Sequence, residues 1–274
     1  MSGQISQDES TEMTFWDHLD VLRKSLFRIL GVLVVVLIGV FIALPNIFDS
    51  FVLGPTDGDF FLYKWLSFLG TGSGKSSLIF PDLGSDFHVD IININVASQF
   101  LTHISTAFWF SLVLIFPYLI YEVWRFVRPA LFPHEKKGVG GAFLCGTGLF
   151  FVGCAVGYCL VFPLTFRFLT QYQIAAEITN QISLNSYIST FLTIVFIMGA
   201  VFEIPILAWI LSLLGVLHKS FLKKYRKYAA VVLLILAALI TPSGDPFTLS
   251  VVWLPLYLLY ELSILVVKKD PVEA

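Results

Sequence analysis

Long runs of apolar residues dominate the chain, and most polar residues lie between them. Such runs lack the alternation of apolar and polar residues that β-barrel strands show. They predict an all-α, polytopic membrane protein with six transmembrane helices. The six spans are expected at about 25–44, 96–121, 139–161, 188–214, 228–240 and 247–267. The same pattern predicts a cytoplasmic amphipathic segment, a long outside loop and a cytoplasmic tail, at residues 1–24, 46–95 and 268–274.

Composition supports a membrane protein. Of the 274 residues, 57% are hydrophobic and 13% are charged, whereas soluble domains carry about 25% charged residues. A soluble globule and a disordered chain are therefore excluded, and a net charge of −2 argues against nucleic-acid binding. The three cysteines, Cys145, Cys154 and Cys159, have no His or acid at ligand spacing, so we expect no metal, disulfide or cofactor. Residues 1–22 contain five acids and no base, the reverse of a secretory signal peptide.

The basic residues give the expected orientation. Three bases, Lys64, Lys75 and Arg167, lie on the side that follows the first, third and fifth runs, and 14 of the 17 lie on the other side. The positive-inside rule assigns the richer side to the cytoplasm, so both termini are expected inside. The fifth run is short: its roughly 13 residues cover about 20 Å of a hydrocarbon core about 30 Å thick.

Two acids lie within the predicted spans. Glu203 is in the middle of the fourth, just before Pro205, and Glu261 is near the inner end of the sixth. An ionised acid at mid-bilayer is costly, so Glu203 is a candidate functional residue, and a protonated Glu203 in a hydrogen bond is the structural alternative. The backbone of Pro205 cannot donate a hydrogen bond, which predicts a kink beside the acid. For Glu261 an acid that reaches toward the interface is an equal alternative.

Three other features are weaker evidence for a functional site than the two acids within spans. Residues 69–77 resemble a phosphate-binding loop, but Leu69 replaces its first glycine and no strand leads into it, so a flexible insertion is expected. His103 has no acid nearby in sequence, so we expect it to make a structural hydrogen bond. Glu135 lies between His134 and Lys136. It is either a local partner for lysines or a carboxylate that receives a ligand's guanidinium in a bidentate manner.

Several short motifs in order along nearly the whole chain resemble the TatC family, the TatC subunit of the twin-arginine protein translocase. The motif around Glu135 and the Phe-Glu-x-Pro sequence at Glu203 are together specific. The matching stretches are residues 18–24, 124–135, 157–164, 202–205 and 240–245, followed by Pro255 and Glu261. The resemblance implies a concave bundle in the bacterial inner membrane. It also implies a receptor for signal peptides with paired arginines, without covalent chemistry and with single-span Tat subunits and other copies of the chain as partners.

The resemblance also implies site residues. Glu135 would receive the arginines, with Phe126 and Arg23 in the same signal-peptide-binding surface. Glu203, Pro205 and Glu261 would belong to an intramembrane pocket, which outside-loop residues Pro55 and Asp245 would cap. The family usually has a second acidic arginine contact where this chain has Val21. Asp17, one turn earlier on the same helical face, and Asp20, about 100° around, are the two candidates to replace it.

A transporter is the main alternative. An ion- or proton-coupled small-solute transporter would use Glu203 and Glu261 as a relay. No convincing repeat relates the first three spans to the last three, which weakens an inverted-repeat transporter. The two hypotheses differ in what they predict for the purified chain. The transporter predicts solute flux by this chain alone, whereas the translocase subunit predicts no flux and co-purification with small single-span partners.

Overall fold

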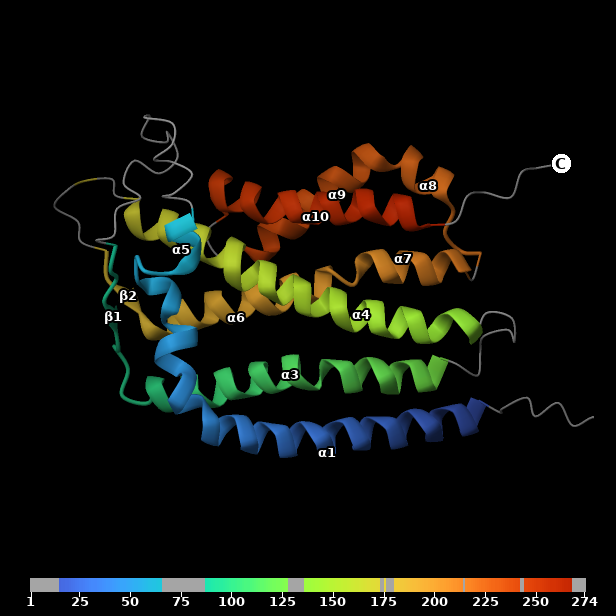
Figure 1. Ribbon diagram of the computed structural model, residues 1–274, viewed down its shortest axis with the longest axis horizontal. Helices are drawn as coiled ribbons and strands as arrows, with labels where there is room; N and C mark the ends of the chain where they lie inside the picture. Colours follow the sequence, from blue (N-terminus) through green and yellow to red (C-terminus); the bar gives the residue numbers. More distant parts are fainter. Residues whose placement is uncertain are drawn as a thin grey trace, which may run out of the picture.

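Long helices lie side by side along the molecule in the computed structural model (Figure 1). The structure describes residues 15–65, 87–127, 136–172, 175, 180–213, 215–241 and 244–267. The main helices are α1 (Phe15–Ile47), α3 (Ser98–Val127), α4 (Lys136–Val156), α6 (Leu184–Val201), α7 (Ile204–Leu213), α9 (Arg226–Ile240) and α10 (Pro246–Val266). Shorter elements are the π-turns η1 (Phe48–Val52) and η4 (Gly157–Val161), the 3-10 turn η2 (Gly54–Thr56), and helices α5 (Phe162–Gln171) and α8 (Lys219–Lys224).

Helix α1 is continuous from the predicted amphipathic segment into the first apolar run. It also continues through Pro45 to Ile47, beyond the expected end of the first run. Proline cannot donate to the carbonyl four residues before it. That carbonyl, on Phe41, instead lies 2.8 Å from Nε2 of His103 on α3, and the two rings stack with centroids 3.9 Å apart. As expected, His103 makes a structural hydrogen bond.

Helices α4 and α6 approach closely at small residues. A Cβ atom added to Gly153 would lie 2.6 Å from the carbonyl oxygen of Met198 and 2.7 Å from the Cβ of Phe202. Only a glycine allows this backbone-to-backbone approach, the usual arrangement where membrane helices pack tightly. The main buried cluster lies around this contact and includes Phe162, Phe191 and Ile194.

One end of the bundle is capped by short elements, which we call the capped end. Strands β1 (Ile91–Ile92) and β2 (Ile182–Ser183) pair in parallel there, with Ile91 opposite Ile182. Turns η1 and η2 and helix α5 also lie at this end (Figure 1). Residues 61–65 are helical, within the long loop expected at 46–95. The candidate phosphate loop at 69–77 lies outside the described residues.

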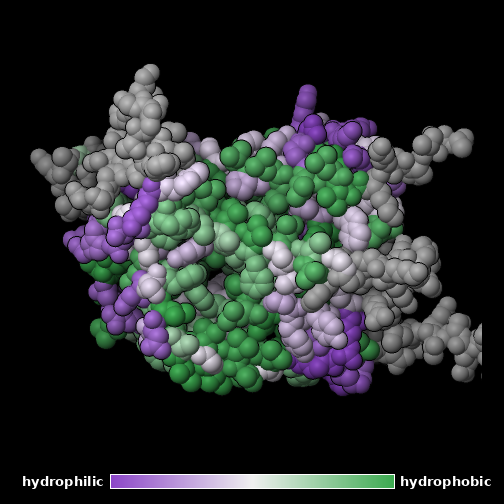
Figure 2. Space-filling view, in the orientation of Figure 1, coloured by the Kyte–Doolittle hydropathy of each residue, from purple (hydrophilic) through white to green (hydrophobic). Residues whose placement is uncertain are grey.

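The opposite end carries most of the bases, and we call it the basic end. Helix α1 begins there, α10 ends there, and α8 lies there (Figure 1). The bases with described side chains at this end lie on α1, α8, the last turn of α3 and the start of α9: Arg23, Lys24, Arg28, Arg125, Lys219, Lys223, Lys224, Arg226 and Lys227. Figure 2 shows an apolar belt between hydrophilic residues at the two ends. Large apolar side chains such as Val35 and Ile42 are about 70% exposed, as lipid-facing residues are.

Five described helical segments are long and apolar enough to cross a membrane: Leu19–Thr56, Ser98–Phe126, Leu144–Gln171, Leu184–Leu213 and Pro246–Val266. Helix α9, which corresponds to the short fifth run, has 15 residues and packs beside α10, where the Trp253 indole donates to the carbonyl of Ala230 at 3.1 Å. The all-α membrane fold is therefore confirmed. The fifth span, at α9, and with it the total of six, stays a prediction.

Candidate functional site

At the basic end, a buried carboxylate holds an arginine. Glu122 on α3 is only 2% exposed, and its Oε1 and Oε2 accept from Nε and Nη2 of Arg28 on α1 at 2.9 and 2.8 Å. Tyr118 donates to Oε1 at 3.0 Å, and Arg28 also donates to Ser25 at 2.9 Å. This is the bidentate geometry that a carboxylate makes with arginine and that lysine cannot copy.

Sequence reasoning missed Glu122. The second run was expected to end at Tyr121, which placed the next residue in a loop, whereas α3 continues to Val127. The apolar residues that follow, among them Val123 and Trp124, were the signal that the helix goes on. An acid that sequence reasoning placed in a loop therefore lies within the candidate span Ser98–Phe126.

The sequence-predicted residues of α1 lie one to three turns from this pair. Asp20 is about half exposed and contacts Arg23 at 3.0 Å and Lys24 at 3.1 Å. The Asp17 backbone belongs to α1, but its side chain lies outside the described part. Phe126 is half-buried near the end of α3, and Glu135 lies outside the described residues. The structure thus brings Asp20, Arg23 and the end of α3 to the basic end.

Glu203 lies at a break in the fourth apolar run. Helix α6 ends at Val201 and α7 begins at Ile204, so the chain is kinked where Pro205 was expected to disturb it. The carboxyl group faces α4: a Cβ added to Gly146 would lie 3.2 Å from Oε2. Its Oε1 is buried and has no hydrogen-bond partner among the described residues. The bundle thus holds an acid against α4 at a glycine, where an added Cβ would press on the carboxyl group.

Glu261 is in a different environment. Its Oε2 accepts from Nη2 of Arg226, at the start of α9, at 2.7 Å. The side chain is 30% exposed, so it is a partly accessible acid with a cationic neighbour. Glu203 and Glu261 therefore do not share a hydrogen bond, and the two-acid relay finds no support in their contacts.

Pro55 is buried in η2 at the capped end. Its carbonyl and that of Pro163 both accept from the Tyr63 hydroxyl at 3.1 Å, so Tyr63 joins the loop after η2 to α5. Burial raises the pKa of Tyr63, so the phenol stays a donor. The guanidinium of Arg167 lies 4.8 Å from the centroids of the Tyr63 and Phe87 rings. The cap is thus fixed by side chains from three separate segments.

Asp245 begins α10. Its Oδ1 accepts from the backbone N–H groups of Phe247 and Thr248 at 3.0 and 2.9 Å. This is an N-cap, which satisfies donors that the first helical turn leaves free. The geometry gives Asp245 a structural role in positioning the start of α10.

His88 and Asp57 close the loop above η2. Nδ1 of His88 lies 2.5 Å from Oδ1 of Asp57, and Nε2 lies 3.4 Å from Asp90. The hydrogen bond with Asp57, and then the charge of Asp57, raise the pKa of His88. This contact is therefore sensitive to pH near neutrality.

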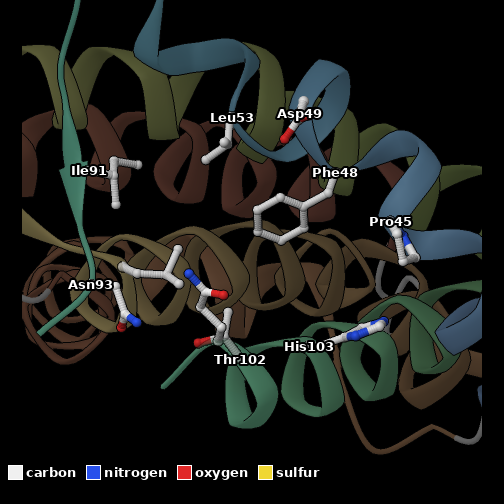
Figure 3. Close-up of a pocket in the computed structure, with 10 residues that line it drawn as sticks. Pro45, Phe48, Asp49, Leu53, Ile91, Asn93, Thr102 and His103 are labelled. Carbon is white, nitrogen blue, oxygen red and sulfur yellow. The ribbon is translucent and has the colours of Figure 1, made fainter. Parts of the chain in front are cut away.

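A cavity of about 430 Å³ lies near the capped end, between α1, η1, β1 and α3. Figure 3 shows Phe48 projecting into it, with Asp49 and His103 on different sides. A second cavity of about 290 Å³ is almost wholly apolar and is lined by residues of α3, α4 and α6, among them Trp109, Cys154 and Phe196. Among the described residues, no group of three or more His, Cys, Asp or Glu could hold a metal ion.

Comparison with known proteins identifies the family. The family model described as "Sec-independent protein translocase protein (TatC)" matches residues 17–255. The chain belongs to the TatC family. A TatC relative from Blattabacterium sp. subsp. Periplaneta americana is 35% identical over 258 residues, covering 94% of this chain and 96% of its own length. One from Deinococcus radiodurans is 37% identical over 191 residues, covering 69% and 70%.

Solved structures agree with the TatC assignment. A structure titled "Crystal Structure of Twin Arginine Translocase Receptor- TatC" matches with a TM-score of 0.64 and 28% identity, covering 91% of this chain and 97% of that one. A second, in the detergent DDM, matches with a TM-score of 0.63. The family resemblance inferred from the motifs is confirmed. The chain is a component of a Sec-independent protein translocase, and this assignment favours protein transport over the small-solute transporter.

Proposed function

We propose that this TatC-family chain is the receptor for signal peptides with paired arginines, in a translocase that exports folded proteins with energy from the proton-motive force. The single observation that carries the proposal is the match, over nearly the full chain, to a structure named a twin-arginine translocase receptor. The receptor itself catalyses no reaction. Its other partners are single-span Tat subunits and further copies of the chain.

The basic end is the cytoplasmic face, so both termini are cytoplasmic and the membrane is the bacterial inner membrane. The bases at this end support the assignment through the positive-inside rule. Helix α9 is the fifth of six spans, and its 15 residues favour a locally thin bilayer. The capped end, with Pro55 and Asp245, then faces the opposite compartment.

Glu135 is the main arginine site, with Phe126 and Arg23 beside it, and Asp17 and Asp20 are the candidates that the sequence offers for a second acid. A guanidinium needs a carboxylate that can receive it through two parallel hydrogen bonds. The test is export of a folded twin-arginine reporter by Glu135→Gln, together with crosslinking of its signal peptide to the chain. We expect Glu135→Gln to stop export and lose peptide crosslinking. Normal export with normal crosslinking would overturn the assignment.

Glu203 serves a step after docking, together with Pro205. Its buried carboxyl oxygen without a described partner suits an acid that waits for a donor from an inserted peptide or partner helix. Glu203→Ala is therefore expected to keep surface binding of the signal peptide and to impair its deeper insertion. Loss of binding at the surface would contradict this division between the two acids.

A further inference from the structure

Glu122 already binds a guanidinium, and that guanidinium belongs to the chain itself. Arg28 is 40% exposed, whereas the carboxylate beneath it is 2% exposed. Both carboxylate oxygens are occupied by the fork of Arg28. We propose that Glu122 is the second arginine contact of the receptor, and that an arginine of the signal peptide displaces Arg28 from it. This inference rests on the proposed function.

The carboxylate is fixed in the position that such a site needs. Tyr118, one turn earlier on α3, donates to Oε1 at 3.0 Å, so one oxygen keeps a neutral donor when the cation leaves. The arginine, by contrast, comes from the neighbouring helix α1 on a long, flexible side chain. Exchange of one guanidinium for another therefore moves a side chain at the surface and leaves the buried acid in place.

Glu122 suits a second contact better than Asp20 does. Asp20 is 48% exposed and has single contacts with a lysine and an arginine of its own helix, which surface screening weakens. Such contacts select positive charge in general. The fork at Glu122 selects the planar guanidinium, because an ammonium cannot make two parallel hydrogen bonds to one carboxylate.

The position along α3 also fits. Phe126 lies four residues after Glu122, so both project from the same face of α3 about 6 Å apart along its axis. Phe126 is the aromatic residue proposed to lie beside the signal peptide. A peptide that contacts this ring at the surface would therefore place a neighbouring arginine within one helical turn of Glu122.

Displacement gives Arg28 an inhibitory role that a merely structural ion pair lacks. A structural pair predicts that a change in either partner weakens the protein and its binding alike. Competition between Arg28 and the peptide predicts that the two changes shift peptide affinity in opposite directions. Removing the acid removes the site, while weakening the internal arginine makes the site easier to occupy.

The experiment measures binding of a fluorescent twin-arginine peptide, and of its twin-lysine version, to the purified full-length chain in lipid nanodiscs. Loss of one bidentate contact in Glu122→Gln should weaken twin-arginine binding about tenfold and leave twin-lysine binding nearly unchanged. Arg28→Lys keeps the charge but not the fork, so twin-arginine binding should tighten by about threefold or more. In the Glu122→Gln background, Arg28→Lys should give no gain.

Melting temperatures of the same samples show whether the Arg28–Glu122 ion pair has been lost, and both single variants should melt lower. A structural pair then predicts weaker peptide binding in both variants, whereas displacement predicts weaker binding in Glu122→Gln and tighter binding in Arg28→Lys. Weaker or unchanged binding in Arg28→Lys, or undiminished binding in Glu122→Gln, would overturn the inference. If Glu135→Gln weakens binding while neither of these variants changes it, only the inference fails. If Glu135→Gln has no effect either, the proposed receptor function fails.

Discussion

Replacing Gly153 with alanine should force α4 and α6 apart at the place that positions Glu203. The added Cβ would lie 2.6 Å from the Met198 carbonyl oxygen and 2.7 Å from the Phe202 Cβ, whereas unstrained heavy-atom contacts are about 3.5–4.0 Å. Backbone and Cβ atoms cannot rotate away as a side-chain tip can. The helices must therefore separate by about 1 Å, and Phe202 must move with the acid that follows it.

Overpacking of this kind costs about 1–3 kcal/mol. At about 2–4 °C of melting temperature per kcal/mol for a chain of this size, Gly153→Ala should melt several degrees lower in detergent. The matched control is Gly148→Ala on the same helix, where an added Cβ meets nothing within 4 Å. Alanine stabilises a helix interior by up to about 1 kcal/mol relative to glycine, so the control should melt at the same temperature or higher.

Thermal unfolding followed by tryptophan fluorescence measures both variants, and export of a twin-arginine reporter measures the consequence at Glu203. Gly153→Ala should lose export together with stability, while Gly148→Ala keeps both. Equal melting temperatures for the two variants would refute the packing argument. Reduced stability with full export would refute the link between this contact and the acid.

Three further predictions concern the ends of the bundle. Asp245→Ala removes the N-cap of α10 and should cost about 1 kcal/mol, seen as a lower melting temperature; no change would contradict the capping role. Asp57 raises the pKa of His88 above the unfolded value of about 6.5, so its stabilisation is complete below pH 6.5 and is lost as pH rises through the folded pKa. The melting-temperature advantage of the wild type over His88→Gln should shrink between pH 5.5 and 8, and an advantage that grows with pH would be the opposite of this linkage. His103→Leu should cost about 1 kcal/mol or more by leaving a carbonyl unpaired, and much less in a Pro45→Ala background; an equal cost in both backgrounds would contradict the proposed compensation.

The hydrophobic pattern predicted the helices because each long apolar run needs internal hydrogen bonds in lipid. It could not place the helix ends, because those depend on residues far away in sequence. Helix α1 passes Pro45 because His103 supplies a donor to the carbonyl that the proline leaves free. The parallel pairing of β1 with β2 joins two-residue strands from distant loops, which carry no strand pattern of their own.

The sequence predicted some residues of the candidate site and missed others, again because contacts between residues far apart in sequence cannot be seen in it. Glu203 stands out in the sequence because it interrupts an apolar run, and Glu261 does so to a lesser degree. Glu122 does not, because it follows the last residue assigned to its run and its partner Arg28 lies 94 positions earlier. An ion pair between helices becomes visible only when the fold sets the two helices side by side. The roles of Glu135 and Asp17 stay predictions.

Selective binding of paired arginines is the central claim, and one measurement tests it most directly. The wild-type chain in nanodiscs is titrated with a signal peptide that carries two arginines and with the same peptide carrying two lysines. We predict at least about tenfold tighter binding of the arginine peptide, because charge-assisted bidentate hydrogen bonds contribute roughly 1.5–3 kcal/mol each and lysine cannot form them. Equal affinity for the two peptides would contradict the account.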